Sequence, residues 1–264
     1  MRNITKFVLK FYHLENDIFF NQLFDTGEAL FTFNNNVTGN IWNHAFPYNI
    51  EGKTEEELEL KFKTFLQDTI SFFLSKKRKP VVYLDEKYFS TKLLDLLYEN
   101  KFERFDNEAW MRIRKIKKSV VKDYKLTKKY IDDLSKYDDF GKVVGECFSP
   151  EYAEEFKEDF SKVFGFKKIE HFTFYDESNI LIGAASVYYD KTTAHIHNVS
   201  VLPQHRRHGY GTIVVKQMYD HIRNELKIKD IILQCDGMTV ENFYKHLGAE
   251  AFYRRYGYIL NVEV

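Results

Sequence analysis

Apolar and polar residues alternate with a period of two in three consecutive segments of the second half of the chain. These segments span residues 169–178, 180–190 and 194–201, and turns with the sequences DES and DKTT interrupt them. Such alternation is typical of half-buried strands, and short polar turns join neighbouring strands in antiparallel order. The pattern therefore predicts an antiparallel meander of three strands.

Helical periodicity surrounds this meander. Residues 211–226 place Val214, Val215, Met218 and Ile222 at helical spacing, which predicts an amphipathic helix. The pattern predicts three further helices in this half, over 130–148, 149–165 and 239–248, and three further strands, over 119–129, 230–236 and 250–264.

Two of these helices carry terminal signals. Ser149 is the expected N-cap of the helix over 149–165, with Pro150 at its first helical position. Gly248 is expected to end the helix over 239–248, because glycine readily adopts the left-handed conformation found after a last helical turn.

The first half of the chain repeats part of this order. Residues 80–113 read as buried strand, polar loop, helix and aromatic strand, which is the order of residues 230–260. The amphipathic helix expected over 54–77 corresponds to the helix from Gly211. The repetition predicts an internal duplication with domains at 1–115 and 116–264.

Composition narrows the functional classes. The 264 residues include 39 Lys and Arg and 39 Asp and Glu, so no net charge attracts nucleic acid or an anionic membrane. The basic stretch 111–130 fits a domain junction with a solvated strand, and a nucleic-acid patch is the alternative. The mean hydropathy of -0.45 and the broken apolar runs at the N-terminus predict a cytoplasmic protein without membrane span or signal peptide. The two cysteines, Cys147 and Cys235, suggest no metal site and no disulfide framework.

The richest chemical signal follows the strand over 194–201. Residues 201–211 read VLPQHRRHGYG, with two glycines one residue apart directly before a helix. A dinucleotide fingerprint would need a third glycine where Val214 stands, and a Walker loop would need Lys after the last glycine. Glycines at this place nevertheless let the backbone approach a ligand closely, and a helix N-terminus attracts an anion.

This stretch resembles the pyrophosphate loop of the GCN5-related N-acetyltransferase (GNAT) superfamily, whose pattern is V-x-P-x-x-[RQ]-x-x-G-x-[GA]. The resemblance covers residues 119–264 and implies an α/β fold with a mixed, largely antiparallel sheet flanked by helices. It also implies acetyl-CoA as cosubstrate, and makes the first half a degenerate GNAT-like domain without the loop. The implied coenzyme-binding residues are Val199, Val201, Arg206, Arg207, His208, Gly209, Tyr210, Gly211 and Thr212.

The resemblance also suggests catalytic residues. Tyr244, four residues before Gly248, stands where the family has a tyrosine that protonates the departing thiolate. The alternative for Tyr244 is an ordinary core aromatic.

Two histidines precede the loop at a spacing similar to that of arylalkylamine N-acetyltransferases. His195 and His197 are expected to share a strand face with Val199 and Val201, and an ordinary imidazole titrates at about 6.5, which suits proton transfer near neutral pH. The alternative is a pair of structural histidines bonded to the backbone.

The expected reaction is acetyl transfer from acetyl-CoA to a primary amine by direct attack, with a small-molecule amine as the acceptor. Two alternatives remain: a non-catalytic acyl-CoA-binding or regulatory module, and an acetyltransferase acting on a protein or peptide amine. The sequence gives no prediction of the acceptor's identity or of an oligomeric state.

Overall fold

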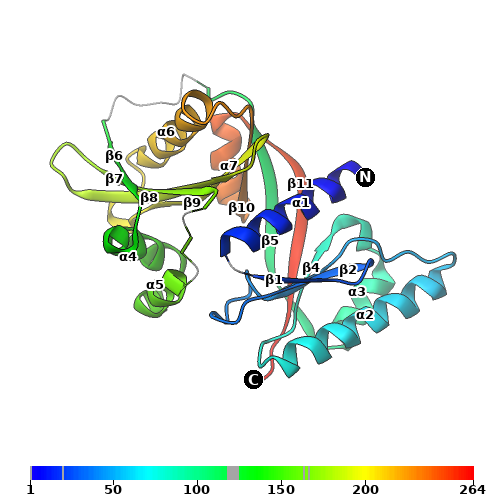
Figure 1. Cartoon of the computed structure of the whole chain (residues 1–264). Helices are drawn as coiled ribbons and strands as arrows, with labels where there is room; N and C mark the ends of the chain where they lie inside the picture. The colour runs from blue at the N-terminus through cyan, green and yellow to red at the C-terminus, as the bar shows by residue number, and fades with distance from the viewer. Residues whose placement is uncertain (1, 20, 118–124, 163, 166) are drawn as a thin grey trace. The chain divides into compact units, whose positions relative to one another are not determined.

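The computed structural model consists of two compact units (Figure 1). It describes all residues except 1, 20, 118–124, 163 and 166. The first unit comprises Met1–Ala109 and Tyr253–Val264, and the second comprises Trp110–Phe252. Two strands, β5 (Phe102–Ile113) and β11 (Ala249–Leu260), contribute one part to each unit.

The second unit contains the remaining predicted strands and helices of its half of the chain. Its strands are β6 (Thr127–Ile131), β7 (Ile169–Tyr175), β8 (Leu181–Tyr189), β9 (Thr193–Val201) and β10 (Asp230–Asp236). Its α-helices are α4 (Tyr137–Phe148), α5 (Ala153–Lys162), α6 (Tyr210–Asn224) and α7 (Met238–Leu247), and its 3-10 turns are η3 (Leu134–Lys136), η4 (Pro150–Tyr152) and η5 (Pro203–His205).

The predicted meander is confirmed. In the second unit the strand order is β11-β5-β10-β9-β8-β7-β6, and β6 to β9 pair antiparallel with their neighbours, whereas β9 and β10 are parallel. Aspartates form both meander turns: Asp176 Oδ1 accepts the N–H groups of Ser178 and Ile180, and Asp190 Oδ1 accepts those of Thr192 and Thr193. Asx turns of this kind replace the backbone bonds that a tight turn leaves unmade.

Helices cover both faces of the meander (Figure 1), with α4 and α5 on one side and α6 on the other. The ring of Phe140 in α4 lies 5.2 Å from that of His171, whereas His221 in α6 lies 5.0 Å from the ring of the next strand residue, Phe172. Successive strand residues point to opposite faces, so these contacts assign one face to each helix. The apolar positions predicted for α6, including Val214 and Met218, are buried.

Two elements begin later along the chain than the sequence predicted. The helix expected from 130 begins at Tyr137, because Tyr130 and Ile131 pair with β7 as part of β6. The strand expected over 119–129 is observed only from Thr127, and residues 119–124 lie outside the described residues.

Ser149 is not a side-chain N-cap. It precedes Pro150, but Pro150 opens the 3-10 turn η4 and the α-helix begins only at Ala153. Ser149 makes no capping hydrogen bond through its side chain, so the serine-proline signal marks a turn between two helices here.

The first unit has the same layered construction. Its strands run in the order β1-β2-β3-β4-β11-β5, and its core combines aromatic residues of the sheet and of the helix beside it, such as Phe31, Phe62 and Phe73. Its elements are α1 (Arg2–Phe19), β1 (Gln22–Asp25), β2 (Ala29–Phe33), β3 (His44–Pro47), α2 (Glu55–Ser75), β4 (Val81–Asp85), η1 (Glu86–Tyr88) and α3 (Thr91–Glu99).

The order β4-α3-β5 repeats as β10-α7-β11, as the sequence pattern predicted. The two copies of this strand-helix-strand motif exchange a strand. In each copy, the last strand of the other copy lies between its two strands. In the first unit β11 lies between β4 and β5, and in the second β5 lies between β10 and β11.

The C-terminal segment therefore folds with the first unit, which differs from the predicted domains 1–115 and 116–264. A buried ion pair fixes it there: Arg255 donates from Nε and Nη2 to the two carboxylate oxygens of Glu108, at 2.7 and 3.0 Å. Its Nη1 donates to the Tyr12 hydroxyl at 2.6 Å. Bidentate pairs of this kind combine strength with a fixed geometry.

None of the helices within the described residues is long and apolar enough to cross a lipid bilayer.

Candidate functional site

The glycine-containing loop connects β9 to α6 through η5. Two of its residues have positive φ angles, Arg207 at 69° and Gly209 at 92°, and Gly209 is the residue that precedes the first helical turn. Glycine adopts this conformation without strain, whereas a Cβ at Gly209 would oppose it. The local sequence thus turns the chain sharply from the strand end into the helix.

The N-terminus of α6 carries no side-chain cap and no acidic residue in its first turn. The first amide groups of a helix have no partner within the helix, and together with the helix dipole they attract anions. Tyr210, Gly211 and Thr212 form this first turn, and all three are partly exposed. The arrangement can hold a phosphate group on backbone donors.

Arg206 closes the loop back onto the strand. Its Nε donates to the carbonyl of Val201 at 3.0 Å, while its side chain is otherwise exposed, as are those of Arg207 and His208. The thiol of Cys147, near the end of α4, donates to the same carbonyl at 3.4 Å. These contacts hold the end of β9 in place beside the loop.

Gly211 is not required by packing. A Cβ built on it would lie 3.4 Å from the ring of Phe243 and 3.9 Å from Val201, which is ordinary van der Waals contact. The protein interior therefore accepts a methyl group here, in agreement with the G/A position of the family pattern.

A β-bulge changes which residues of β9 share a face. Gly183 pairs with Val201 and Ala184 with Ser200, whereas Ser186 pairs with His197, so β9 holds one residue more than β8 between these pairs. Asn198, with φ at 51°, lies in this extra stretch. An extra residue reverses the alternation. His195 and His197 therefore share a face as predicted, but the prediction that Val201 points with them is wrong.

The two parallel strands separate beside the loop. The ladder between β9 and β10 ends at the pair Ile196 and Leu233, although β9 continues to Val201 and β10 to Asp236. Beyond this point the backbone of β9, including Val199 and Val201, does not pair with β10. Unpaired strand backbone is a surface to which an extended ligand can add as a strand would.

His195 and His197 lie together on the face of the meander that α4 covers. Their ring centroids are 5.5 Å apart, and the ring of Tyr188 lies edge-on to both, at 4.4 and 5.5 Å. Nδ1 of His195 shares a hydrogen bond with the Tyr188 hydroxyl. His195 is fully buried, whereas His197 is partly exposed.

Burial changes the titration expected for His197. Loss of solvation lowers the pKa of His197 from 6.5 to about 4, because an imidazolium is poorly stabilised away from water. The expectation of titration near neutrality is therefore wrong for His197, which stays neutral over the whole physiological range.

Tyr244 lies in α7 and is 5% exposed, with its ring 5.0 Å from that of Phe243. Burial raises its pKa well above the usual value of a phenol, so its hydroxyl keeps its proton. The helix ends at Gly248, with φ at 105°, as the sequence predicted.

Sequence reasoning missed three polar residues that lie on the same sheet face as the histidines. They are Tyr188, Ser186 and His171, which pair across the meander with His195, with His197 and with Ser186, respectively. The period-two alternation of the sequence already assigned each of these residues to one face of its own strand. Matching them to β9 required the register of β8 against β9, which runs without interruption from the turn at Asp190 to the pair Ser186 and His197.

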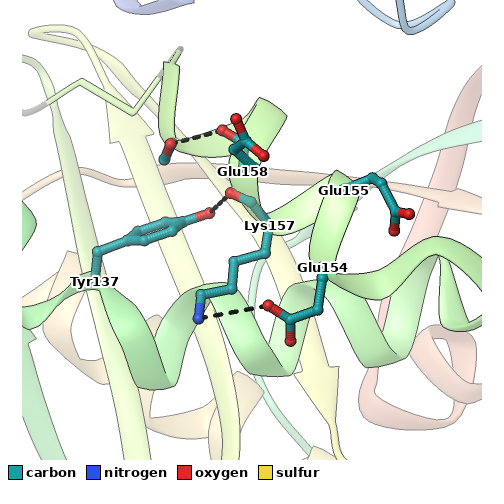
Figure 2. Close-up of a pocket in the computed structure, with 6 residues that line it drawn as sticks. Tyr137, Glu154, Glu155, Lys157 and Glu158 are labelled. Atoms are coloured by element: carbon teal, nitrogen blue, oxygen red, sulfur yellow. Dashed lines mark hydrogen bonds and ion pairs between the residues drawn. The ribbon is translucent and has the colours of Figure 1, made fainter.

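A shallow hollow of about 530 Å³ lies elsewhere, between α4 and α5 (Figure 2). Its polar groups bond to one another: the Tyr137 hydroxyl donates to the carbonyl of Lys157 at 2.7 Å, and Lys157 pairs with Glu154 at 3.9 Å. No residue of the loop and neither histidine lines it.

Residues 137–258 match a model described as Acetyltransferase (GNAT) family. No curated protein matches the chain significantly.

Solved structures share the fold at low sequence identity. A functionally unknown conserved protein from Staphylococcus epidermidis ATCC 12228 has a TM-score of 0.73 at 14% identity, over 92% of this chain and 96% of its own. A GCN5-related N-acetyltransferase from Kribbella flavida has a TM-score of 0.66 at 11% identity, over 92% and 90%. A tandem GNAT protein from the clavulanic acid biosynthesis pathway has a TM-score of 0.51 at 12% identity, over 84% and 76%.

Residues 137–258, most of which lie in the second unit, thus match the acetyltransferase (GNAT) family model, and the chain shares its fold with these solved structures.

Proposed function

We propose that this protein is an N-acetyltransferase that transfers the acetyl group of acetyl-CoA to a primary amine. One observation carries the proposal: the N-terminus of α6, without side-chain cap or first-turn acid, directly follows Gly209 in the loop after β9. If the pyrophosphate bound there, the rest of the coenzyme would lie along the edge of β9 that is not paired with β10.

Coenzyme recognition would rest mainly on backbone. The amides of Gly209, Tyr210 and Gly211 and the Thr212 hydroxyl would hold the pyrophosphate, with the exposed cations of Arg206, Arg207 and His208 around it. The backbone of Val199 and Val201 would pair with the pantetheine arm. The carbonyl of Val201 already accepts from Arg206, so the arm would pair chiefly with Val199.

Direct attack by the amine, without an acyl-enzyme intermediate, agrees with the environments of the two cysteine thiols. Burial raises the pKa of Cys147, so this thiol is a poor nucleophile. Cys235 is buried, with its sulfur 3.6 Å from that of Met111. An acyl-enzyme intermediate requires an accessible thiol with a lowered pKa, whereas the pKa of Cys147 is raised and Cys235 is buried.

The histidine pair would accept the proton that the attacking amine loses. His197 is the better placed of the two to meet the acceptor, because it is partly exposed whereas His195 is fully buried. Its lowered pKa keeps it neutral, and only a neutral imidazole can act as base. The similarity of the pair to that of arylalkylamine N-acetyltransferases supports this role.

Acetyl-CoA with a panel of amines, polyamines, amino acids and peptides tests the proposal through release of the CoA thiol. We expect turnover with at least one small primary amine and a product acetylated on nitrogen. Binding of acetyl-CoA without turnover on the whole panel would favour a regulatory module. Turnover confined to peptides would favour a protein acetyltransferase.

Removing the Tyr244 hydroxyl tests the proposed acid. Tyr244→Phe should lower kcat on the order of tenfold or more and leave the KM for acetyl-CoA unchanged, because the hydroxyl would serve only the departing thiolate. Steady-state kinetics with Tyr219→Phe provide the control, since the Tyr219 hydroxyl donates to the carbonyl of Arg114 away from the site. An unchanged kcat would show that Tyr244 is an ordinary core aromatic and not the proposed acid.

Calorimetry should give one acetyl-CoA per chain, because the corresponding helix of the first unit is closed to anions. Thr54 accepts the N–H of Glu57 at 3.2 Å, and Glu57 accepts the N–H of Lys53 at 2.8 Å. This capping box and the acids Glu55, Glu56 and Glu57 occupy the N-terminus of α2. A second site of equal affinity would contradict the assignment.

A further inference from the structure

His221 lies buried between α6 and the meander, and both of its ring nitrogens face ionisable groups. Its Nε2 lies 2.7 Å from Oε2 of Glu170 in β7, and its Nδ1 lies 3.0 Å from Oε1 of Glu225 at the end of α6. Nζ of Lys128 in β6 is 3.1 Å from the same Nδ1. This cluster is on the face of the meander that α6 covers, opposite to the face of the histidine pair.

The two contacts of Nδ1 exclude one another. An ionised carboxylate only accepts a hydrogen bond, and an ammonium only donates one. Nδ1 must therefore carry a proton to bond to Glu225, and must lack it to accept from Lys128. Nε2 needs a proton in both cases, because its partner is a carboxylate. The arrangement thus supports two forms of His221: an imidazolium bonded to both carboxylates, and a neutral ring bonded to Glu170 and Lys128.

The carboxylate of Glu170 is held as an ionised acceptor. The Tyr189 hydroxyl of β8 donates to its Oε1 at 2.9 Å, while its Oε2 faces His221. Although burial opposes the charge, the hydrogen bonds from His221 and Tyr189 lower the pKa of Glu170. Burial raises the pKa of the nearby Tyr130 in β6, so this phenol adds no charge.

The charges around His221 balance when its ring is protonated, whereas a neutral ring leaves one negative charge in excess. Lys128 does not depend on Nδ1, because its Nζ also lies 4.5 Å from the centroid of the Phe172 ring and 3.7 Å from Glu225. His221 is in the last turn of α6, where the helix dipole stabilises a cation. Although burial opposes the charge, the hydrogen bonds to Glu170 and Glu225 outweigh it and raise the pKa of His221.

We propose that His221 is a pH-responsive clamp between α6 and the sheet. As an imidazolium it donates to Glu170 across the interface and to Glu225 within the helix. When the Nδ1 proton passes to solvent, the ring exchanges Glu225 for Lys128, and the bond to Glu170 loses the strength that the positive charge gave it. The clamp does not depend on the proposed function, because its four residues lie outside the loop and the histidine pair.

The clamp should stabilise the fold on the acidic side of its titration. Since the pKa of His221 is raised above the value of about 6.5 in an unfolded chain, the stabilisation is fully present below about pH 6.5 and is lost as pH rises through the folded value. Burial instead lowers the pKa of His44, His171 and His197, so their contributions change mainly below about pH 6.5.

An NMR titration of the histidine rings in the full chain measures the midpoint of His221. The signal is assigned with His221→Gln, or through the contact of the ring with Phe172, whose centroid is 5.0 Å away. We expect a midpoint above the ordinary value of about 6.5. A midpoint at or below that value would overturn the proposal.

Two variants should move this midpoint in opposite directions. Glu170→Gln should lower it by about 1 pH unit, because an opposite charge at this distance typically shifts a pKa by about 1–3 units. Lys128→Met removes a cation that competes for Nδ1, so it should raise the midpoint. Lys129→Met is the matched control, since Lys129 is on the other face of β6 with its Nζ 3.1 Å from Asn179.

The control should leave the midpoint nearly unchanged. A midpoint that falls in Lys128→Met would contradict the clamp. If Glu170→Gln does not fold, the midpoint of the unmodified protein and that of Lys128→Met still decide.

Urea unfolding between about pH 6 and 9 measures the effect on stability. The difference in free energy of unfolding between the unmodified protein and His221→Gln should shrink as pH rises. His246→Gln, at an exposed position in the last turn of α7, is the control, and its difference should stay constant. A difference for His221→Gln that stays constant or grows with pH would show that the imidazole is a fixed structural contact and not a switch.

Discussion

Thr212→Glu should weaken acetyl-CoA binding by about 100-fold while leaving the protein at least as stable as before. Thr212 is the third residue of α6, and a carboxylate in a first helical turn stabilises a helix by about 0.3–1 kcal/mol through its dipole. The same carboxylate would face the pyrophosphate. Two like charges at about 4 Å repel by roughly 1–4 kcal/mol near a protein surface, and about 1.4 kcal/mol is tenfold in affinity.

Thr212→Gln separates charge from shape in this experiment. Glutamine has the same size as glutamate and no charge, so it should reduce affinity by far less. Calorimetric titration with acetyl-CoA and urea unfolding of both variants give the two quantities. Equal affinities for the Glu and Gln variants would show that no anion binds at the start of α6.

The local sequence pattern was sufficient to predict the strands and helices around the candidate site. Alternation predicted β7, β8 and β9, helical spacing predicted α6, and Gly248 marked the end of α7. Each of these signals acts over a few residues, through side-chain period or through backbone conformation. The loop between β9 and α6 was likewise readable, because the positive φ angle of Gly209 is a local requirement of the backbone.

Features that depend on distant partners were not readable. The bulge at Asn198 that turns Val201 away from the histidines exists only in the register of β9 against β8. The placement of Tyr253–Val264 in the first unit depends on pairing of β11 with β4 and on the ion pair between Arg255 and Glu108. A short-range sequence pattern does not specify which distant segment a strand pairs with. The division into two units and the residues that lie beside His195 and His197 were therefore known only from the structure.

Burial also lowers the pKa of His197, and this changes the expected pH dependence of the reaction. The pKa of His197 is lowered to about 4, so its neutral form predominates at every pH well above that value. As pH falls towards about 4, the imidazole gains a proton and can no longer act as base. The acidic limb of kcat/KM that belongs to His197 should therefore lie near pH 4 rather than near neutrality.

The double variant His195→Gln, His197→Gln should lower kcat on the order of 100-fold or more, with the KM for acetyl-CoA nearly unchanged because the coenzyme would be held by the loop. Since the two rings are 5.5 Å apart and would act as a unit, the double variant should lose less than the product of the single losses. Initial rates of the single and double variants between about pH 3 and 9, with circular dichroism at each pH to exclude unfolding, measure both effects. A double variant with full turnover and an unaltered pH profile would make the histidines structural and move the base elsewhere in the second unit.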